Sequence, residues 1–147
     1  MRLSRIVDYL AVATVSVVIL LVVAQVTMRY VLNAPLTWSE ELASFALVWL
    51  TFLGSVICMR DHEHIEIEVL VDQFPEKARR VIIVLSRVVS AAFLLLLAWY
   101  GLDLTQQNFA TTSPANHIHM GYVYVIIPLG ALGMFYYVVK SIWKGDK

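Results

Sequence analysis

Four long runs of apolar residues, separated by short polar connections, fill most of this sequence. The runs cover about residues 9–28, 42–59, 81–104 and 120–143. Because an α-helix rises ~1.5 Å per residue, each run is long enough to cross a hydrocarbon core roughly 30 Å thick. Backbone groups in lipid must be hydrogen-bonded within their own segment, so each run is expected to be helical. The pattern predicts an all-α membrane protein with four transmembrane helices in a single domain, residues 1–147.

The connection between the second and third runs has a different pattern. Polar and aliphatic residues alternate from His64 to Val69, which taken alone would indicate a β-strand. A lone strand at the membrane surface would leave both of its edges unpaired. We therefore predict a short interfacial amphipathic helix here, over about residues 66–74.

Positive charges are sorted to one side of the predicted helices. Nine of the eleven Lys and Arg residues lie before the first run, between the second and third, or at and after the end of the fourth: Arg2, Arg5, Arg60, Lys77, Arg79, Arg80, Lys140, Lys144 and Lys147. The other two are Arg29, in the first connection, and Arg87, inside the third run. By the positive-inside rule, we predict a multi-pass protein of the bacterial inner membrane with both termini in the cytoplasm.

Composition and the positions of the acidic residues exclude several classes of function. Hydrophobic residues make up 60% of the chain and charged residues 15%, so lipid rather than water is its main solvent. The formal net charge is zero, which gives no overall attraction to nucleic acid. Ion-coupled transporters need ionisable or unwound sites near the membrane middle, and no acidic residue lies in the middle of a run. We therefore expect that this chain does not transport by itself and is not a small multidrug antiporter, which would carry an acid in its first helix.

The histidines and the single cysteine do not indicate a catalytic or cofactor site. The four histidines form two pairs, His62/His64 and His117/His119, which the charge pattern places on opposite sides of the membrane. Haem or metal binding would need several ligands to converge, so we expect no cofactor, no metal and no enzymatic activity. Cys58 is the only cysteine, and we expect it to be a small buried apolar residue.

Arg29 is the one cation predicted on the outer side, at a depth close to that of Glu40 and Glu41. A charge near the hydrocarbon edge is costly unless paired, so Arg29 is expected either to join the first two helices through one of these carboxylates or to bind a lipid phosphate. The sequence does not choose between the two carboxylates. At the start of the second helix, Thr37 with Glu40 three residues later and Ser39 fit the N-cap equally well.

Further residues are expected at the membrane interfaces. The predicted lipid or interface anchors are Tyr30, Lys77, Arg79 and Arg80. Trp38 also fits an aromatic belt. Arg87 lies about two helical turns into the third run, where it either reaches the interface as an anchor or packing partner, or contacts a companion subunit.

Three motifs follow one another across nearly the whole chain. They are Arg29-Tyr30 with Trp38-Ser39-Glu40-Glu41, the stretch 63–68, and Ser113-Pro114 with residues 120–124, Pro128 and Gly130. In order, spacing and four-helix setting, they resemble the Q-type small membrane subunit of tripartite ATP-independent periplasmic (TRAP) transporters. Glu68 stands where that family often has Asp.

The resemblance implies a supporting role in sodium-coupled transport. In this family a large multi-helix membrane subunit carries the substrate and sodium sites, and a soluble periplasmic binding protein delivers a carboxylate such as a dicarboxylate or sialic acid. The small subunit flanks the large one, supports its scaffold and helps to dock the binding protein. Structural or subunit-interface roles are accordingly expected for Arg29, Trp38, Glu40, Glu41 and Arg87, with membrane lipids as further partners. The alternative is a four-helix assembly or structural subunit of another complex.

Overall fold

The computed structural model describes residues 2–34, 36–61 and 75–144. Its helices are α1 (Arg2–Val31), α2 (Thr37–Asp61), α4 (Glu76–Gln107), α5 (Met120–Tyr124) and α6 (Ile126–Lys144). Four segments are long and apolar enough to cross a membrane, namely Arg5–Val31, Thr37–Asp61, Ala78–Gln107 and Met120–Trp143. The prediction of four transmembrane helices is confirmed, and the helices extend a few residues beyond the apolar runs. The predicted interfacial helix at 66–74 lies outside the described residues.

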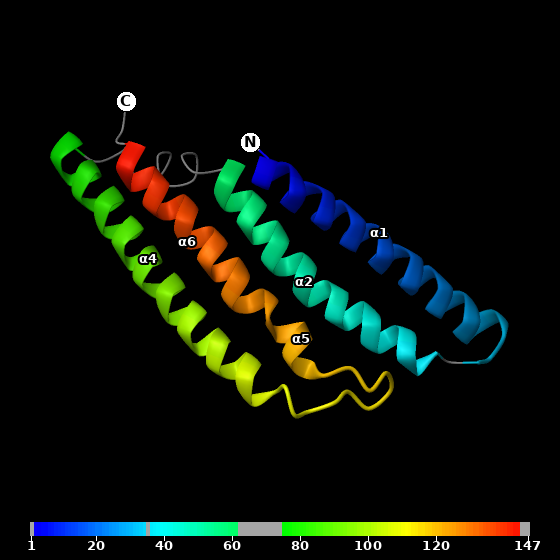
Figure 1. The fold of residues 1–147 in the computed structure, drawn as a ribbon. Coiled ribbons are helices and arrows are strands. Elements are labelled where there is room, and N and C mark those ends of the chain that lie inside the picture. Colours follow the sequence, from blue (N-terminus) through cyan, green and yellow to red (C-terminus); the bar gives the residue numbers. More distant parts are fainter. Residues whose placement is uncertain (1, 35, 62–74, 145–147) are drawn as a thin grey trace.

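The long helices lie side by side in one layer, in the order α1, α2, α6, α4 (Figure 1). Within the described residues α1 packs chiefly against α2. The start of α1 and the end of α6 lie at one end of the layer, here called the terminal end. The α1–α2 and α4–α5 connections lie at the opposite end, here called the loop end. The fold is therefore a helical layer, in which each long helix has at most two neighbours along the row.

Helix α6 is the centre of the packing. One buried cluster joins α2, α4 and α6 through Val56, Leu94, Met134 and Val138, and a second joins α1, α2 and α6 through Ala11, Leu53 and Ile126. Close approach depends on glycines, because a Cβ atom at Gly101 would lie 2.9 Å from Ile127 and one at Gly130 would lie 2.8 Å from Phe52.

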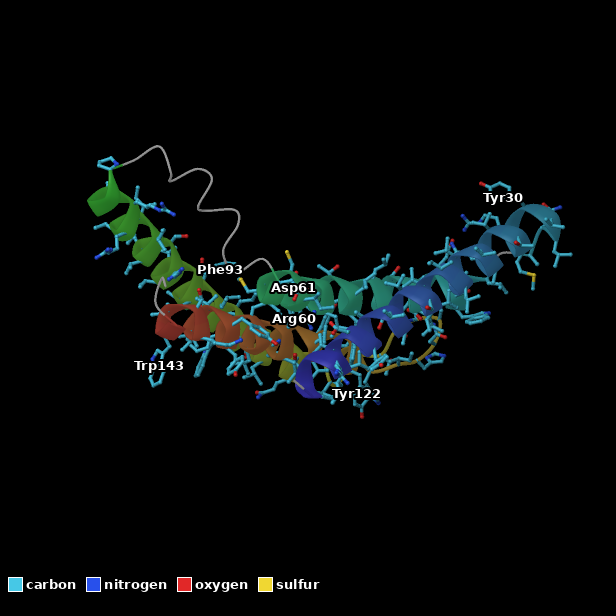
Figure 2. The ribbon with its side chains drawn as sticks, turned by 90° about the horizontal axis from the view of Figure 1, so that it is seen from above. Tyr30, Arg60, Asp61, Phe93, Tyr122 and Trp143 are labelled. Atoms are coloured by element: carbon cyan, nitrogen blue, oxygen red, sulfur yellow. The ribbon has the colours of Figure 1, made fainter. Side chains whose placement is uncertain are left out.

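Burial falls from the centre of the layer to its edge. In the most apolar window of the fourth span 39% of residues are buried, against 6% for the first span. Many large apolar side chains are therefore exposed, among them Ile19, Leu20, Leu95 and Leu96. Tyr30 and Trp143 project away from the ribbon near opposite ends of the layer (Figure 2). Such a surface requires lipid or partner subunits rather than water.

The fourth span is broken into α5 and α6 at Val125. Pro128 explains the break, because it has no N–H to donate to the carbonyl of Tyr124, four residues earlier, and its ring crowds that carbonyl. The break packs against α4, where Gly101 leaves room for Ile127 and Pro128. The single helix predicted over residues 120–143 is thus a short helix and a long one in series.

Two local predictions for α2 are wrong. Cys58 is exposed rather than buried, because α1 and α6 cover only part of the circumference of α2. The N-cap interpretations fail because the helix begins at Thr37, and the carbonyl of Leu36 accepts the backbone N–H of Glu40 at 3.3 Å. The Ser39 hydroxyl donates to the same carbonyl at 2.8 Å instead of accepting a bond from the first turn.

Candidate functional site

The loop end carries an ion pair between the end of α1 and the first turn of α2. The Arg29 guanidinium donates to Glu40 Oε1, and Gln25 Nε2 donates to the same oxygen at 3.2 Å. The side chains of Arg29 and Glu40 are 47% and 41% exposed, so the pair lies at the surface. The position of Glu40 is also favourable, since an acid in the first turn of a helix meets the positive end of the helix dipole. Of the two carboxylates left open by the sequence, the structure selects Glu40.

Glu41 has a different role, because it holds the α4–α5 connection. Its Oε2 accepts hydrogen bonds from the Asn116 backbone N–H at 2.8 Å, from Asn116 Nδ2 at 2.8 Å and from the Ser113 hydroxyl at 3.1 Å. Asn116 Nδ2 also donates to the carbonyl of Trp38 at 2.9 Å. These bonds fix the connection onto the start of α2, more than 70 residues away in the chain.

The connection itself has an ordered backbone. An isolated bridge joins Thr112 to His119, and the Ser113 N–H donates to the carbonyl of Ile118 at 2.9 Å. Ser113 is 1% exposed, and its hydroxyl accepts the Ile118 N–H at 3.2 Å while donating to Glu41. The sequence predicts neither Ser113 nor Asn116 as a partner of Glu41, although Ser113-Pro114 belongs to the third family motif.

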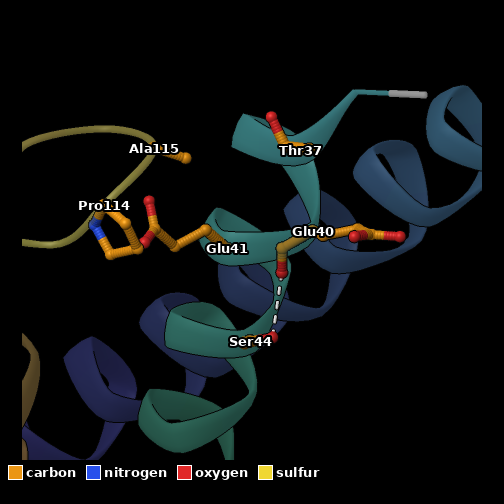
Figure 3. Close-up of a pocket in the computed structure, with 6 residues that line it drawn as sticks. All are labelled: Thr37, Glu40, Glu41, Ser44, Pro114 and Ala115. Atoms are coloured by element: carbon orange, nitrogen blue, oxygen red, sulfur yellow. Dashed lines mark hydrogen bonds between the residues drawn. The ribbon is translucent and has the colours of Figure 1, made fainter. Parts of the chain in front are cut away.

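A shallow groove of about 560 Å³ opens beside this network. It is lined by Thr37, Glu40, Glu41, Ser44, Pro114 and Ala115. Figure 3 shows the two adjacent glutamates directed apart, Glu40 toward α1 and Glu41 toward Pro114. Within the described ranges no group of three His, Cys, Asp or Glu side chains is close enough to hold a metal ion. The groove is open and combines the two glutamates with the Ser44 hydroxyl, Pro114 and Ala115.

The terminal end carries a second ion pair between the same two helices. Arg60 Nη1, on α2, donates to Asp8 Oδ1, on α1, at 2.7 Å. Arg60 also donates to its neighbour Asp61 at 2.7 and 3.0 Å. The Arg60 side chain is 19% exposed, so this pair is more sheltered than the one at the loop end. Helices α1 and α2 are thus joined by charges at both ends, and the sequence had indicated only one of these contacts.

The remaining predicted residues lie apart from the loop end or at its edge. Trp38 and Tyr30 are exposed, as an interface belt requires. Arg79, Arg80 and Arg87 are on the part of α4 near the terminal end, with Arg80 exposed and the other two half-buried. Lys77 belongs to α4, but its side chain is not among those described.

Residues 18–147 match the family model for the DctQ component of tripartite ATP-independent periplasmic transporters. The chain belongs to this family. It is a small permease subunit of a TRAP transporter, a multi-pass membrane protein, and not an enzyme.

The curated relatives are also named as TRAP transporter permease proteins. A putative TRAP transporter small permease protein of Haemophilus influenzae is 21% identical over 145 residues, which cover 99% of this chain and 88% of that protein. The C4-dicarboxylate TRAP transporter small permease protein DctQ of Rhodobacter capsulatus is 31% identical over 98 residues, covering 65% of this chain and 43% of that protein. The sialic acid TRAP transporter permease protein SiaT of Haemophilus influenzae (strain 86-028NP) is 25% identical over 121 residues, covering 82% of this chain but 20% of SiaT. In SiaT the matching segment is thus one part of a longer permease.

Proposed function

We propose that this TRAP small permease subunit takes part in sodium-coupled uptake of a carboxylate, such as a dicarboxylate or sialic acid, by supporting the scaffold of a large membrane subunit. The observation that carries the proposal is the helical layer itself. Its four spans expose large apolar side chains, and the described acidic residues of the spans lie near helix ends, as Asp8, Glu40, Asp61 and Asp103 do. A subunit whose described spans carry no acidic residue at the membrane middle needs a partner that carries the transport site. The relatives named for C4-dicarboxylate and sialic acid support the substrate class.

The loop end is assigned to the periplasm of a bacterial inner membrane, with both termini in the cytoplasm. This orientation follows the positive-inside rule, because Arg5, Arg60, Arg80 and Lys140 lie near the terminal end and Arg29 near the loop end. Single cysteines introduced at Ala115 and at Gln73 in a Cys58→Ala background test it. A membrane-impermeant maleimide added to intact spheroplasts is expected to label the cysteine at position 115 but not the one at position 73. The opposite result would reverse the orientation.

The groove and the Glu41 network are proposed to help dock the periplasmic substrate-binding protein. They lie at the loop end, present an ordered backbone, and combine carboxylate, hydroxyl and backbone groups at the surface. Polar rims of this kind are typical of transient protein interfaces.

The deciding experiment is reconstitution. The subunit is purified alone and together with the large membrane subunit of the same transporter, and each preparation is placed in liposomes with the binding protein outside. Uptake of labelled dicarboxylate or sialic acid driven by a sodium gradient is expected only with both membrane subunits present. Uptake by the small subunit alone would contradict the supporting role. Failure of a large TRAP subunit to co-purify would favour a structural subunit of another complex.

A further inference from the structure

One face of α2 is not covered by the other described helices along most of its length. Helix α2 contacts α1 on one flank and α6 on another, which leaves a third side uncovered by the described helices. The residues along this side recur at alternating intervals of three and four: Ser44, Leu47, Thr51, Gly54, Cys58 and Asp61. All of them are exposed except Gly54, which is half-exposed. This is the heptad spacing with which one helix packs along another at a small crossing angle. We call this set the α2 seam.

The α2 seam differs in composition from the surfaces that face lipid. The exposed positions of α1 and α4 are mostly large apolar residues, such as Ile19, Leu20, Leu95 and Leu96. On α2, all of whose residues are described, the exposed large apolar residues are Trp38 and Leu47 alone. Small and hydroxyl-bearing residues are enriched where transmembrane helices approach one another, because they let backbones come close, whereas lipid gives no such advantage.

Gly54 gives separate support for a close helix contact at the α2 seam. At four other described positions, packing within the chain explains why the residue is glycine. An added Cβ atom at Gly101, Gly121, Gly130 or Gly133 would lie within 3.2 Å of a neighbouring side chain. At Gly54 nothing lies within 4 Å of that position. Glycine weakens a helix interior relative to alanine, and nothing within the described chain requires it here. Close approach of a helix from outside this chain would require it.

The hydroxyl groups on this side do not disturb an apolar contact. Ser44 donates to the carbonyl of Glu40 at 2.9 Å, Thr51 to that of Leu47 at 2.8 Å, and Ser55 to that of Thr51 at 2.8 Å. Each is bonded within α2, so a second helix can cover the seam without stranding a polar atom. At the loop end the seam runs into the groove, to which Ser44 belongs.

We propose that a transmembrane helix of the large permease subunit packs along the α2 seam. The inference rests on the proposed function and adds to it the face that meets the partner. The heptad spacing fits a helix as the occupant, and in SiaT the matching segment is part of a longer permease, which supports the large subunit as the source of that helix. The outer faces of α1 and α4, with their large apolar side chains, then contact lipid.

Site-specific photo-cross-linking in the intact complex tests this placement. A benzophenone amino acid replaces Leu47 on the seam, where the native side chain is already large, and in a matched control it replaces Leu96, which is exposed on α4. After irradiation of membranes, mass spectrometry is expected to identify peptides of the large subunit joined to position 47, and lipid adducts at position 96. Adducts of position 47 with lipid only, or with a second copy of this chain, would overturn the proposal.

Substitution gives an independent test that does not depend on the cross-linker. Gly54→Leu is expected to lower the amount of large subunit recovered per small subunit by roughly tenfold or more, because overpacking a close helix contact weakens it on that scale. The matched control is Ala92→Leu, on the exposed face of α4, which should leave recovery unchanged. Loss of recovery with Ala92→Leu but not with Gly54→Leu would move the interface to α4. If the wild-type pair itself fails to co-purify, the proposed function fails and not merely the choice of face.

Discussion

Arg60 Nη1 lies 2.7 Å from Asp8 Oδ1 and joins the end of α2 to the start of α1. The pair matters because α1 is at the edge of the layer, packs chiefly against α2 among the described helices, and buries few of its residues. With the Arg29–Glu40 pair at the other end, it joins α1 to α2 near both ends of the two helices. Apolar packing inside a membrane gives weak register, since lipid is as apolar as the side chains, so charged contacts at the helix ends have a larger share in positioning.

Removal of either member of the Asp8–Arg60 pair is expected to destabilise the subunit by about 1 kcal/mol, between the values for exposed and buried pairs. Asp8→Ala combined with Arg60→Ala should cost less than the sum of the single changes, because each single change leaves one charge without this partner. Denaturant unfolding in detergent, followed by circular dichroism, measures these values. Asp61→Ala is the control, since Asp61 neighbours Arg60 on the same helix and this contact joins no two helices. Additive effects of the Asp8 and Arg60 changes on the free energy of unfolding would show that the contact between them does not stabilise the subunit.

The two adjacent glutamates are expected to behave differently toward Arg29. Arg29→Ala and Glu40→Gln should be coupled by about 0.5 kcal/mol, as for an exposed ion pair, whereas Arg29→Ala and Glu41→Gln should be additive. The same unfolding measurement gives both cycles, and the coupling should decrease in high salt. Coupling of Arg29 to Glu41 of equal size would contradict the contacts described for the loop end.

Asn116→Ala is expected to loosen the α4–α5 connection, since the Asn116 side chain bonds both Glu41 and the carbonyl of Trp38. The loss should be about 1–3 kcal/mol, because one of the acceptors is charged. Hydrogen exchange of the amides at residues 111–118 should become faster. In the control Asn108→Ala the lost side-chain bond is to Leu104, within the same helix turn, and exchange in this segment should change little. Unchanged exchange in Asn116→Ala would mean that Ser113 and the backbone hold the connection without it.

Gly101→Leu should destabilise the contact between α4 and α6 by about 1–3 kcal/mol, because a Cβ atom there already meets Ile127 at 2.9 Å and Pro128 at 3.2 Å. Thermal unfolding of the isolated subunit measures the effect. Gly54→Ala is the contrasting change: with no atom nearby, it should be neutral or stabilising by up to about 1 kcal/mol in the isolated chain. Equal destabilisation by both changes would contradict the packing around Gly101.

Much of the architecture follows from the sequence alone. The four spans could be read from the apolar runs because a helix in lipid bonds its own backbone, so length and polarity decide its existence locally. The first family motif and the Ser113-Pro114 part of the third lie at the loop-end site. Arg29 could be placed near two carboxylates because depth in the membrane is a one-dimensional property of the sequence.

Only the tertiary structure shows how each helix is rotated about its axis and which helices lie next to one another. Successive residues on a helix point about 100° apart, so Glu40 faces Arg29 on α1 while Glu41 faces Asn116. The sequence places both glutamates at one depth and cannot separate them. The exposure of Cys58 could not be predicted either, because it depends on which flanks of α2 the other helices cover. The Asp8–Arg60 pair joins residues 52 positions apart, so it too became visible only in the tertiary structure. The order of helices in the layer is decided by side-chain packing, above all where glycines let α6 fit between α2 and α4.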